Sequence, residues 1–164
     1  MIVLDNNALV FLYRPDAEQA GLREKMQYLF DSGKEKGSIF GIPAPVLSEF
    51  LIGEHNPAAR QNFLRLFGSK SRVFQILPFD IKSAVACAAV ADILNERLPN
   101  QAGVGSRQKI KVDRQILAIA VSNGAETIVS HDRGLLNAAK ALDLDALAID
   151  EIAVPPEAQP DLFG

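Results

Sequence analysis

The chain has 164 residues, of which 48% are hydrophobic and 23% are charged. This length is enough for one domain with a substantial core and is short for two. The composition is that of an ordinary globular protein, and Pro, Gly or charged residues interrupt every apolar stretch before the roughly 20 residues that a membrane span needs. We therefore expect no membrane-spanning segment, and the single cysteine, Cys87, excludes an internal disulfide.

The formal net charge is −3 and the sequence pI is about 5.4. Taken alone, these values argue against a basic protein surface that binds nucleic acid. If four carboxylates were neutralised by a cation, the rest of the chain would carry +1 instead of −3, and such a surface need not repel phosphate. The N-terminus enters an apolar run without the basic segment of a signal peptide. We therefore expect a cytoplasmic protein, and the charge leaves a nucleic-acid partner possible.

The first half of the chain reads as short strands separated by helices. Gly37 and Gly53 follow amphipathic runs, and Pro45 and Pro57 stand where helices begin, so the element ends are well marked. The pattern predicts a strand at 1–5, helices at 6–13 and 16–36, a strand at 38–42, helices at 43–53 and 56–68, and a strand at 72–77.

The second half repeats this alternation. It predicts a long Ala-rich helix at 80–98, a loop at 99–111, a helix opened by Asp113, a strand at 127–130, a helix opened by Asp132 and a last strand at 144–149. Residues 1–150 would form one domain, and 151–164 a Pro-rich tail on its surface. Strands that alternate with helices predict an α/β sandwich around a mostly parallel sheet.

Four carboxylates stand where such a fold would bring them together. Asp5 ends the first strand, Asp132 follows the strand at 127–130, Asp113 opens a helix and Glu49 lies on the helix after the second strand. Ligands bind outside the carboxyl ends of parallel strands, so Asp5 and Asp132 would approach each other. Gathered carboxylates repel one another unless a cation is present, and Mg²⁺ and Mn²⁺ prefer oxygen ligands. The pattern predicts a Mg²⁺ or Mn²⁺ site suited to phosphodiester hydrolysis.

Each acid also has an ordinary structural explanation. Asp113 and Asp132 are good helix N-caps, Asp5 would suit a turn, and Glu49 would suit a solvated helix face. Taken singly, these explanations are preferred, and only the joint placement of the four acids favours a site. Ser130, two residues before Asp132, is interpreted as a hydroxyl that orients a water at that site.

Five basic residues flank the acids in the sequence. A solvated loop is the usual fate of such a run, whereas the functional interpretation is an edge that binds the phosphate backbone of RNA. The candidates are Arg107, Lys109, Lys111, Arg114 and Arg133.

Four short motifs occur in order along nearly the whole chain: IVLDNNALV, LSEFLIG, DRQILAIA and IVSHD. They are an apolar strand ending in Asp, a Glu followed four residues later by Gly, an Asp-x-x-Ile-x-Ala helix start, and a strand ending in Ser shortly before an Asp. In this order they resemble the PIN-domain family, metal-dependent ribonucleases that include the toxins of bacterial VapBC-type toxin–antitoxin pairs.

The resemblance implies a PIN-like three-layer α/β sandwich over residues 1–150 and an endoribonuclease that uses Mg²⁺ or Mn²⁺. It carries catalytic and metal-binding roles onto Asp5, Glu49, Asp113 and Asp132, with Ser130 and Asn6 in support; Asn6 stands where the family commonly has Thr or Ser. It also implies RNA as the substrate, a homodimer, and a small antitoxin protein as partner if the chain is the toxin of a type II pair.

Two other interpretations stay open. The first is a PIN-like module that has the same fold and binds RNA or protein but does not catalyse cleavage. A haloacid-dehalogenase-like phosphatase also begins with a strand ending in Asp, but its chemistry needs a second Asp two residues on, where this chain has Asn7.

Overall fold

The computed structural model of the chain describes residues 1–14, 20–67, 73–99 and 107–153. Within these ranges the chain forms a five-stranded sheet in the order β3-β2-β1-β4-β5, and each neighbouring pair is parallel. The predicted α/β fold around a parallel sheet is confirmed. The strands are β1 (Ile2–Leu4), β2 (Phe40–Pro43), β3 (Phe74–Leu77), β4 (Thr127–Ser130) and β5 (Asp145–Ala148).

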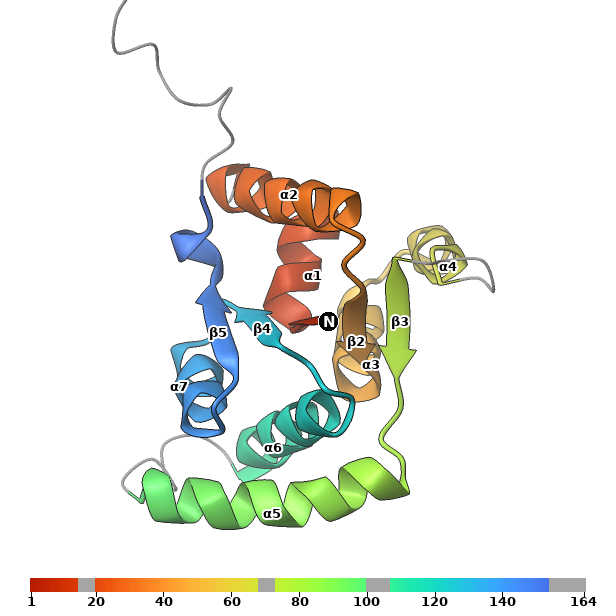
Figure 1. The fold of residues 1–164 in the computed structure, drawn as a ribbon. Coiled ribbons are helices and arrows are strands. Elements are labelled where there is room, and N and C mark those ends of the chain that lie inside the picture. Colours follow the sequence, from red (N-terminus) through yellow and green to blue (C-terminus); the bar gives the residue numbers. More distant parts are fainter. Residues whose placement is uncertain (15–19, 68–72, 100–106, 154–164) are drawn as a thin grey trace, which may run out of the picture.

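Helices cover both faces of this sheet and give the predicted three layers. Figure 1 shows α1 and α2 on one side of the sheet and α5 and α6 on the other. None of the helices in the described part of the chain has the length and apolar character that spanning a membrane requires. The helices are α1 (Asn6–Tyr13), α2 (Ala20–Glu35), α3 (Ala44–Gly53), α4 (Pro57–Arg65), α5 (Ile81–Arg97), α6 (Arg107–Ser122) and α7 (Arg133–Ala141), with a 3₁₀ turn η2 (Ile149–Glu151) after β5.

The local signals in the sequence account for most of these boundaries. The Asp80 carboxylate accepts the Ser83 N–H at 2.8 Å and begins α5, as an N-cap residue does. Gly37 ends α2 with φ +73°, a left-handed conformation that glycine adopts without strain. On β1 both Val3 and Leu4 are fully buried, as expected of a central strand covered on both faces.

One predicted boundary is wrong. The segment 107–111, predicted as part of a loop, is the start of α6, so Asp113 lies inside the helix and does not cap it. Ile110 and Leu117 are one heptad apart and share a face of α6, and this apolar spacing extends the helix upstream of Asp113. Residues 15–19 of the predicted helix at 16–36, residues 100–106 of the predicted loop and residues 154–164 of the predicted tail lie outside the described residues.

The sheet order places a topological switch point beside β1. From β1 the chain builds β2 and β3 on one side, then returns through α5 and α6 to add β4 on the other side. Val3 of β1 is aligned with Gly41 of β2 and with Ile128 of β4. Side chains that follow β1 and β4 therefore meet at a topological switch point, where open α/β sheets bind their ligands.

The contact between α2 and β2 yields a test of the packing. A Cβ added at Gly33 would lie 2.6 Å from Cζ of Phe40, a fully buried ring that Phe30 and Phe74 also contact. Gly33→Ala should lower the free energy of unfolding by up to about 2 kcal/mol, since overpacking costs ~1–3 kcal/mol and the gain in helix propensity offsets about 1 kcal/mol of it. Chemical denaturation measures the difference.

Gly21→Ala is the matched control on the same helix, because a Cβ at Gly21 would meet nothing within 4 Å. It should leave stability unchanged or raise it. A Gly33→Ala protein as stable as Gly21→Ala would contradict this description of the α2 contact.

Candidate active site

Asp5 is a buried carboxylate at the carboxyl end of β1, with 4% of its surface exposed. Its Oδ1 accepts the Ala8 N–H at 2.9 Å and so caps α1. Its Oδ2 accepts a hydrogen bond from the hydroxyl of Ser130, the fully buried last residue of β4. The same hydroxyl accepts the Asp132 N–H at 2.8 Å. Ser130 therefore connects Asp5 with the segment that carries Asp132.

Burial raises the pKa of the Asp5 carboxyl from 3.8 to about 6. Hydrogen bonds from Ser130, Ala8 and Asn7 lower this pKa, and the nearby negative charge of Asp132 raises it. At neutral pH the group is therefore ionised at a cost in free energy, which an adjacent cation would relieve.

Asp132 caps α7, and its second oxygen is paired with Lys109. Oδ1 accepts the N–H groups of Gly134 and Leu135 at 2.8 and 3.3 Å, and Oδ2 lies 2.5 Å from the Lys109 Nζ. Burial raises the pKa of Asp132, but the Lys109 ammonium and the two backbone N–H groups outweigh it and hold the pKa below its ordinary value. Lys109 reaches Asp132 from the first turn of α6, where its side chain is 52% exposed.

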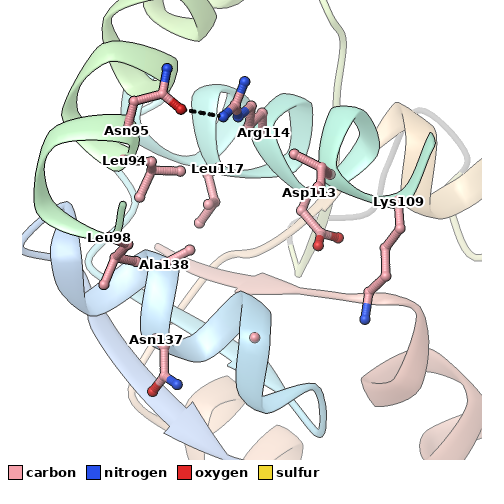
Figure 2. A pocket seen from close by; sticks show the side chains of 11 residues that line it. Leu94, Asn95, Leu98, Lys109, Asp113, Arg114, Leu117, Asn137 and Ala138 are labelled. Carbon is pink, nitrogen blue, oxygen red and sulfur yellow. Dashed lines mark hydrogen bonds between the residues drawn. The ribbon is translucent and has the colours of Figure 1, made fainter. Parts of the chain in front are cut away.

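Asp113 lies one turn after Lys109 on α6, and its carboxylate points into the same space (Figure 2). Burial raises the pKa of Asp113 to about 6, and the charges of Asp132 and Glu49 raise it further while that of Lys109 lowers it. Glu49 is exposed on α3, a helix that packs against α6. The structure thus brings Asp5, Asp113 and Asp132 to one edge of the sheet, with Glu49 at its margin.

The chemistry of these donors fits a hard divalent cation: the charge of Asp132 acts on both Asp5 and Asp113, that of Glu49 acts on Asp113, and the pKa values of Asp5 and Asp113 are raised. In addition, the buried Oδ1 of Asn6 has no hydrogen-bond partner among the described residues. In the present conformation, however, no three His, Cys, Asp or Glu side chains of the described ranges are close enough to hold one ion. Lys109 supplies the positive charge on Asp132 instead. The metal-binding roles therefore stay predictions.

The basic residues predicted to bind RNA fall into three groups. Lys109 shares a face of α6 with Asp113, while Arg107, Lys111 and Arg114 are spaced i, i+4 and i+7 on a different face that is turned well away from it. Arg114 donates to Oδ1 of Asn95 on α5 at 2.8 Å. Arg133 is engaged by η2, with its guanidinium 2.6 Å from Asp150 and 3.1 Å from Glu151.

The sequence analysis missed one contributor to the site. Asn7, considered only as a missing second aspartate, donates to Asp5 and lowers the pKa of that carboxyl. His131 packs edge-on against Phe11 with ring centroids 5.6 Å apart, and its Nδ1 lies 3.9 Å from Asp150. The position of Asn7 in the first turn of a helix capped by Asp5 is the signal that could have found it.

Comparisons with known proteins give one family. The family profile described as PIN domain matches residues 2–141, whereas no curated protein matches the sequence. A crystal structure of VapBC2 from Rickettsia felis, bound to a DNA fragment from their promoter, is similar with a TM-score of 0.62 at 18% identity, covering 90% of this chain and 98% of the other.

Two further crystal structures are similar. VapBC-1 from nontypeable Haemophilus influenzae has a TM-score of 0.59 at 16% identity, covering 92% of this chain and 99% of the other. DNA-bound VapBC from Salmonella typhimurium has a TM-score of 0.55 at 18% identity, covering 90% and 97%. At these identities the likeness concerns the fold alone.

The buried carboxyl of Asp5 makes stability depend on pH. Because its folded pKa of about 6 lies above the unfolded value of 3.8, the folded state binds more protons, and the free energy of unfolding should fall as pH rises between these values. The loss should be about 3 kcal/mol from this one group. Asp5→Asn should roughly halve the slope in EDTA, because Asp113, whose pKa is also raised to about 6, keeps its own contribution, and it should raise stability above pH 7.

Denaturation at a series of pH values measures both effects, with Asp92→Asn on the exposed face of α5 as the control for loss of one carboxylate. Excess Mg²⁺ should also remove the slope in the unmodified protein, since a cation favours the ionised carboxylates. An Asp5→Asn protein that keeps the full slope would refute the assignment.

Proposed function

The chain belongs to the PIN-domain family, whose members are generally nucleases, and from that premise we propose that it is a metal-dependent endoribonuclease, the toxin of a type II toxin–antitoxin pair. The observation that carries this proposal is the group of mutually repelling carboxylates at the carboxyl ends of β1 and β4, flanked by cationic residues of α6. Such a group favours a divalent cation on one side and the phosphates of a nucleic acid on the other.

Asp5, Glu49, Asp113 and Asp132 would hold the cation, Mg²⁺ or Mn²⁺. When bound, such a cation polarises a phosphodiester and lowers the pKa of a water molecule. Ser130 orients the Asp5 carboxylate through its hydroxyl, and the buried amide oxygen of Asn6 is available beside it. Each of these groups is attached to the end of a strand or to a helix, so only side-chain movement is needed to bring the donors onto one ion.

The basic residues of α6 would orient the RNA. Lys109 reaches the carboxylates and would meet the phosphate nearest to them. Arg107, Lys111 and Arg114 lie on a different face of α6, turned well away from Lys109, and would contact phosphates farther along the RNA. Arg133 is already paired with Asp150 and Glu151, so we assign it a smaller share of RNA binding.

We infer a small antitoxin protein and a second copy of this chain as partners. The support for the antitoxin is that the similar solved structures are of VapBC proteins. Exposed apolar side chains at the start of α5, with Ile81 84% and Val85 69% exposed, are available for an interface between copies.

Cleavage of end-labelled RNA tests the proposed activity. Purified protein should produce discrete fragments with Mg²⁺ or Mn²⁺ and none in EDTA. Asp113→Asn should slow cleavage by roughly 100-fold or more, the scale of losses when a group that supports metal or transition state is removed. Asp92→Asn, on an exposed face of another helix, should cleave at the normal rate.

Equal products from Asp113→Asn would indicate a contaminating nuclease. RNA binding without cleavage under either metal would instead favour the second candidate, a PIN-domain module that binds RNA without cutting it.

The contact between Lys109 and Asp132 leads to a separate prediction. Lys109→Met removes a positive charge 2.5 Å from Asp132, so Mn²⁺ should bind more tightly, by roughly two- to fivefold for a partly exposed ion pair. RNA cleavage should nevertheless become slower, since the phosphate loses a cationic contact. Calorimetry and single-turnover kinetics measure the two effects, with Lys82→Met, at an exposed position of α5, as the control for loss of one positive charge. Weaker Mn²⁺ binding in Lys109→Met would show that the lysine supports the metal site.

A further inference from the structure

A pocket of about 320 Å³ lies beside the carboxylates, between α5, α6 and α7. We call it the α5–α7 pocket. Lys109 and Asp113 line one end of it, and the same two side chains face Asp132 in the candidate active site. Figure 2 shows the Asp113 carboxylate and the Lys109 amine on one side of the view. The α5–α7 pocket is therefore continuous with the candidate active site.

The inner walls of the pocket are apolar. Leu94 and Leu98 come from α5, Leu117 from α6 and Ala138 from α7. In Figure 2 these four side chains are grouped at the end away from Lys109. Such walls suit the flat faces of an uncharged ring and not a second phosphate.

Polar groups stand at the rim above these walls. Asn95 and Arg114 line the pocket and are joined by the 2.8 Å hydrogen bond from the guanidinium to the amide oxygen (Figure 2). That bond uses the acceptor of Asn95 and leaves its amide N–H groups, with the remaining guanidinium N–H groups, as donors. Asn137 of α7 adds another amide. The rim is thus rich in donors.

We propose that the α5–α7 pocket binds one nucleobase of the RNA, next to the phosphate that is cut. This inference rests on the proposed function, which it extends to recognition of substrate sequence. A pocket of this size lies at the small end of ligand sites, apolar walls cover the faces of a base, and polar groups at the rim read its edge.

The rim indicates which base edge fits best. Guanidinium and amide N–H donors match an edge that presents acceptors, and the O6 and N7 atoms of guanine are the usual partners of arginine. Guanine is therefore the expected occupant, ahead of adenine and cytosine, which present amino groups on the corresponding edge.

A binding experiment without a scissile bond tests the proposal. The ¹⁵N-labelled protein is titrated to millimolar concentration with each of the four nucleoside 5′-monophosphates and with ribose 5-phosphate, which lacks the base. GMP should shift the amide signals of Leu94, Leu98 and Ala138, whereas ribose 5-phosphate should not. Ala138→Leu fills the pocket and should weaken GMP binding roughly tenfold, the scale of one lost base contact. Ala88→Leu makes the same change on the exposed face of α5 and should have no effect.

Equal shifts with ribose 5-phosphate, or no shifts at the pocket, would overturn the proposal. Binding of an antitoxin peptide at these residues in place of nucleotides would also overturn it. Base-dependent shifts in a protein that cuts no RNA would support the pocket proposal and contradict the proposed nuclease activity. Cleavage of RNA without base-dependent shifts would support the nuclease activity and overturn the pocket proposal.

For an active protein, sequencing the ends of fragments from a random RNA pool adds a second readout. The unmodified protein and Ala88→Leu should share a preference for G at one position beside the cut. Ala138→Leu should cut with that preference reduced roughly tenfold, and an unchanged preference would count against the pocket.

Discussion

The structure depends on the burial of one charge, the Asp5 carboxylate between β1 and β4. A carboxylate taken out of water is costly unless hydrogen bonds and an opposite charge compensate it. Ser130, Asn7 and the Ala8 N–H supply the hydrogen bonds, and no positive group of the described residues is among the contacts that tune Asp5. That unfilled requirement for positive charge, at a switch point of the sheet, makes a cation the natural complement of this edge.

Helix α6 holds the rest of the site in place. Its second half, from Ile116 to Ala120, is almost fully buried, and its last residue is linked to α5 by a 3.0 Å hydrogen bond between the hydroxyls of Ser83 and Ser122. The first half of α6 is less buried and carries Lys109 and Asp113. A rigid support of this kind holds functional side chains more accurately than a loop would, and here the same helix also forms a wall of the α5–α7 pocket.

The sequence predicted these features unevenly, for physical reasons. Element ends with strong local signals, such as Asp80, Gly37 and Asp132, were placed within a few residues, because caps and left-handed glycines act locally. Asp113 was wrongly predicted to open a helix, because an Asp before an apolar run has the form of an N-cap. In the structure it lies inside α6, and the carboxylates of Asp132 and Glu49, from other elements, act on it. That Asp5 and Asp132 approach each other followed from parallel strands. The contact of Lys109 with Asp132 and the pocket could not be predicted in this way. Both depend on how α5 and α7 pack against α6, which no local sequence pattern encodes.

The hydrogen bond between Ser130 and Asp5 joins residues 125 positions apart. During translation β1 leaves the ribosome first and waits for β4, an interval on the order of ten seconds at typical elongation rates. Until β4 arrives, Asp5 has neither its hydroxyl partner nor the strand that brings Asp132 beside it. A growing or prematurely ended chain that lacks β4 therefore has neither contact, and the group of carboxylates becomes complete only after β4 has been synthesised.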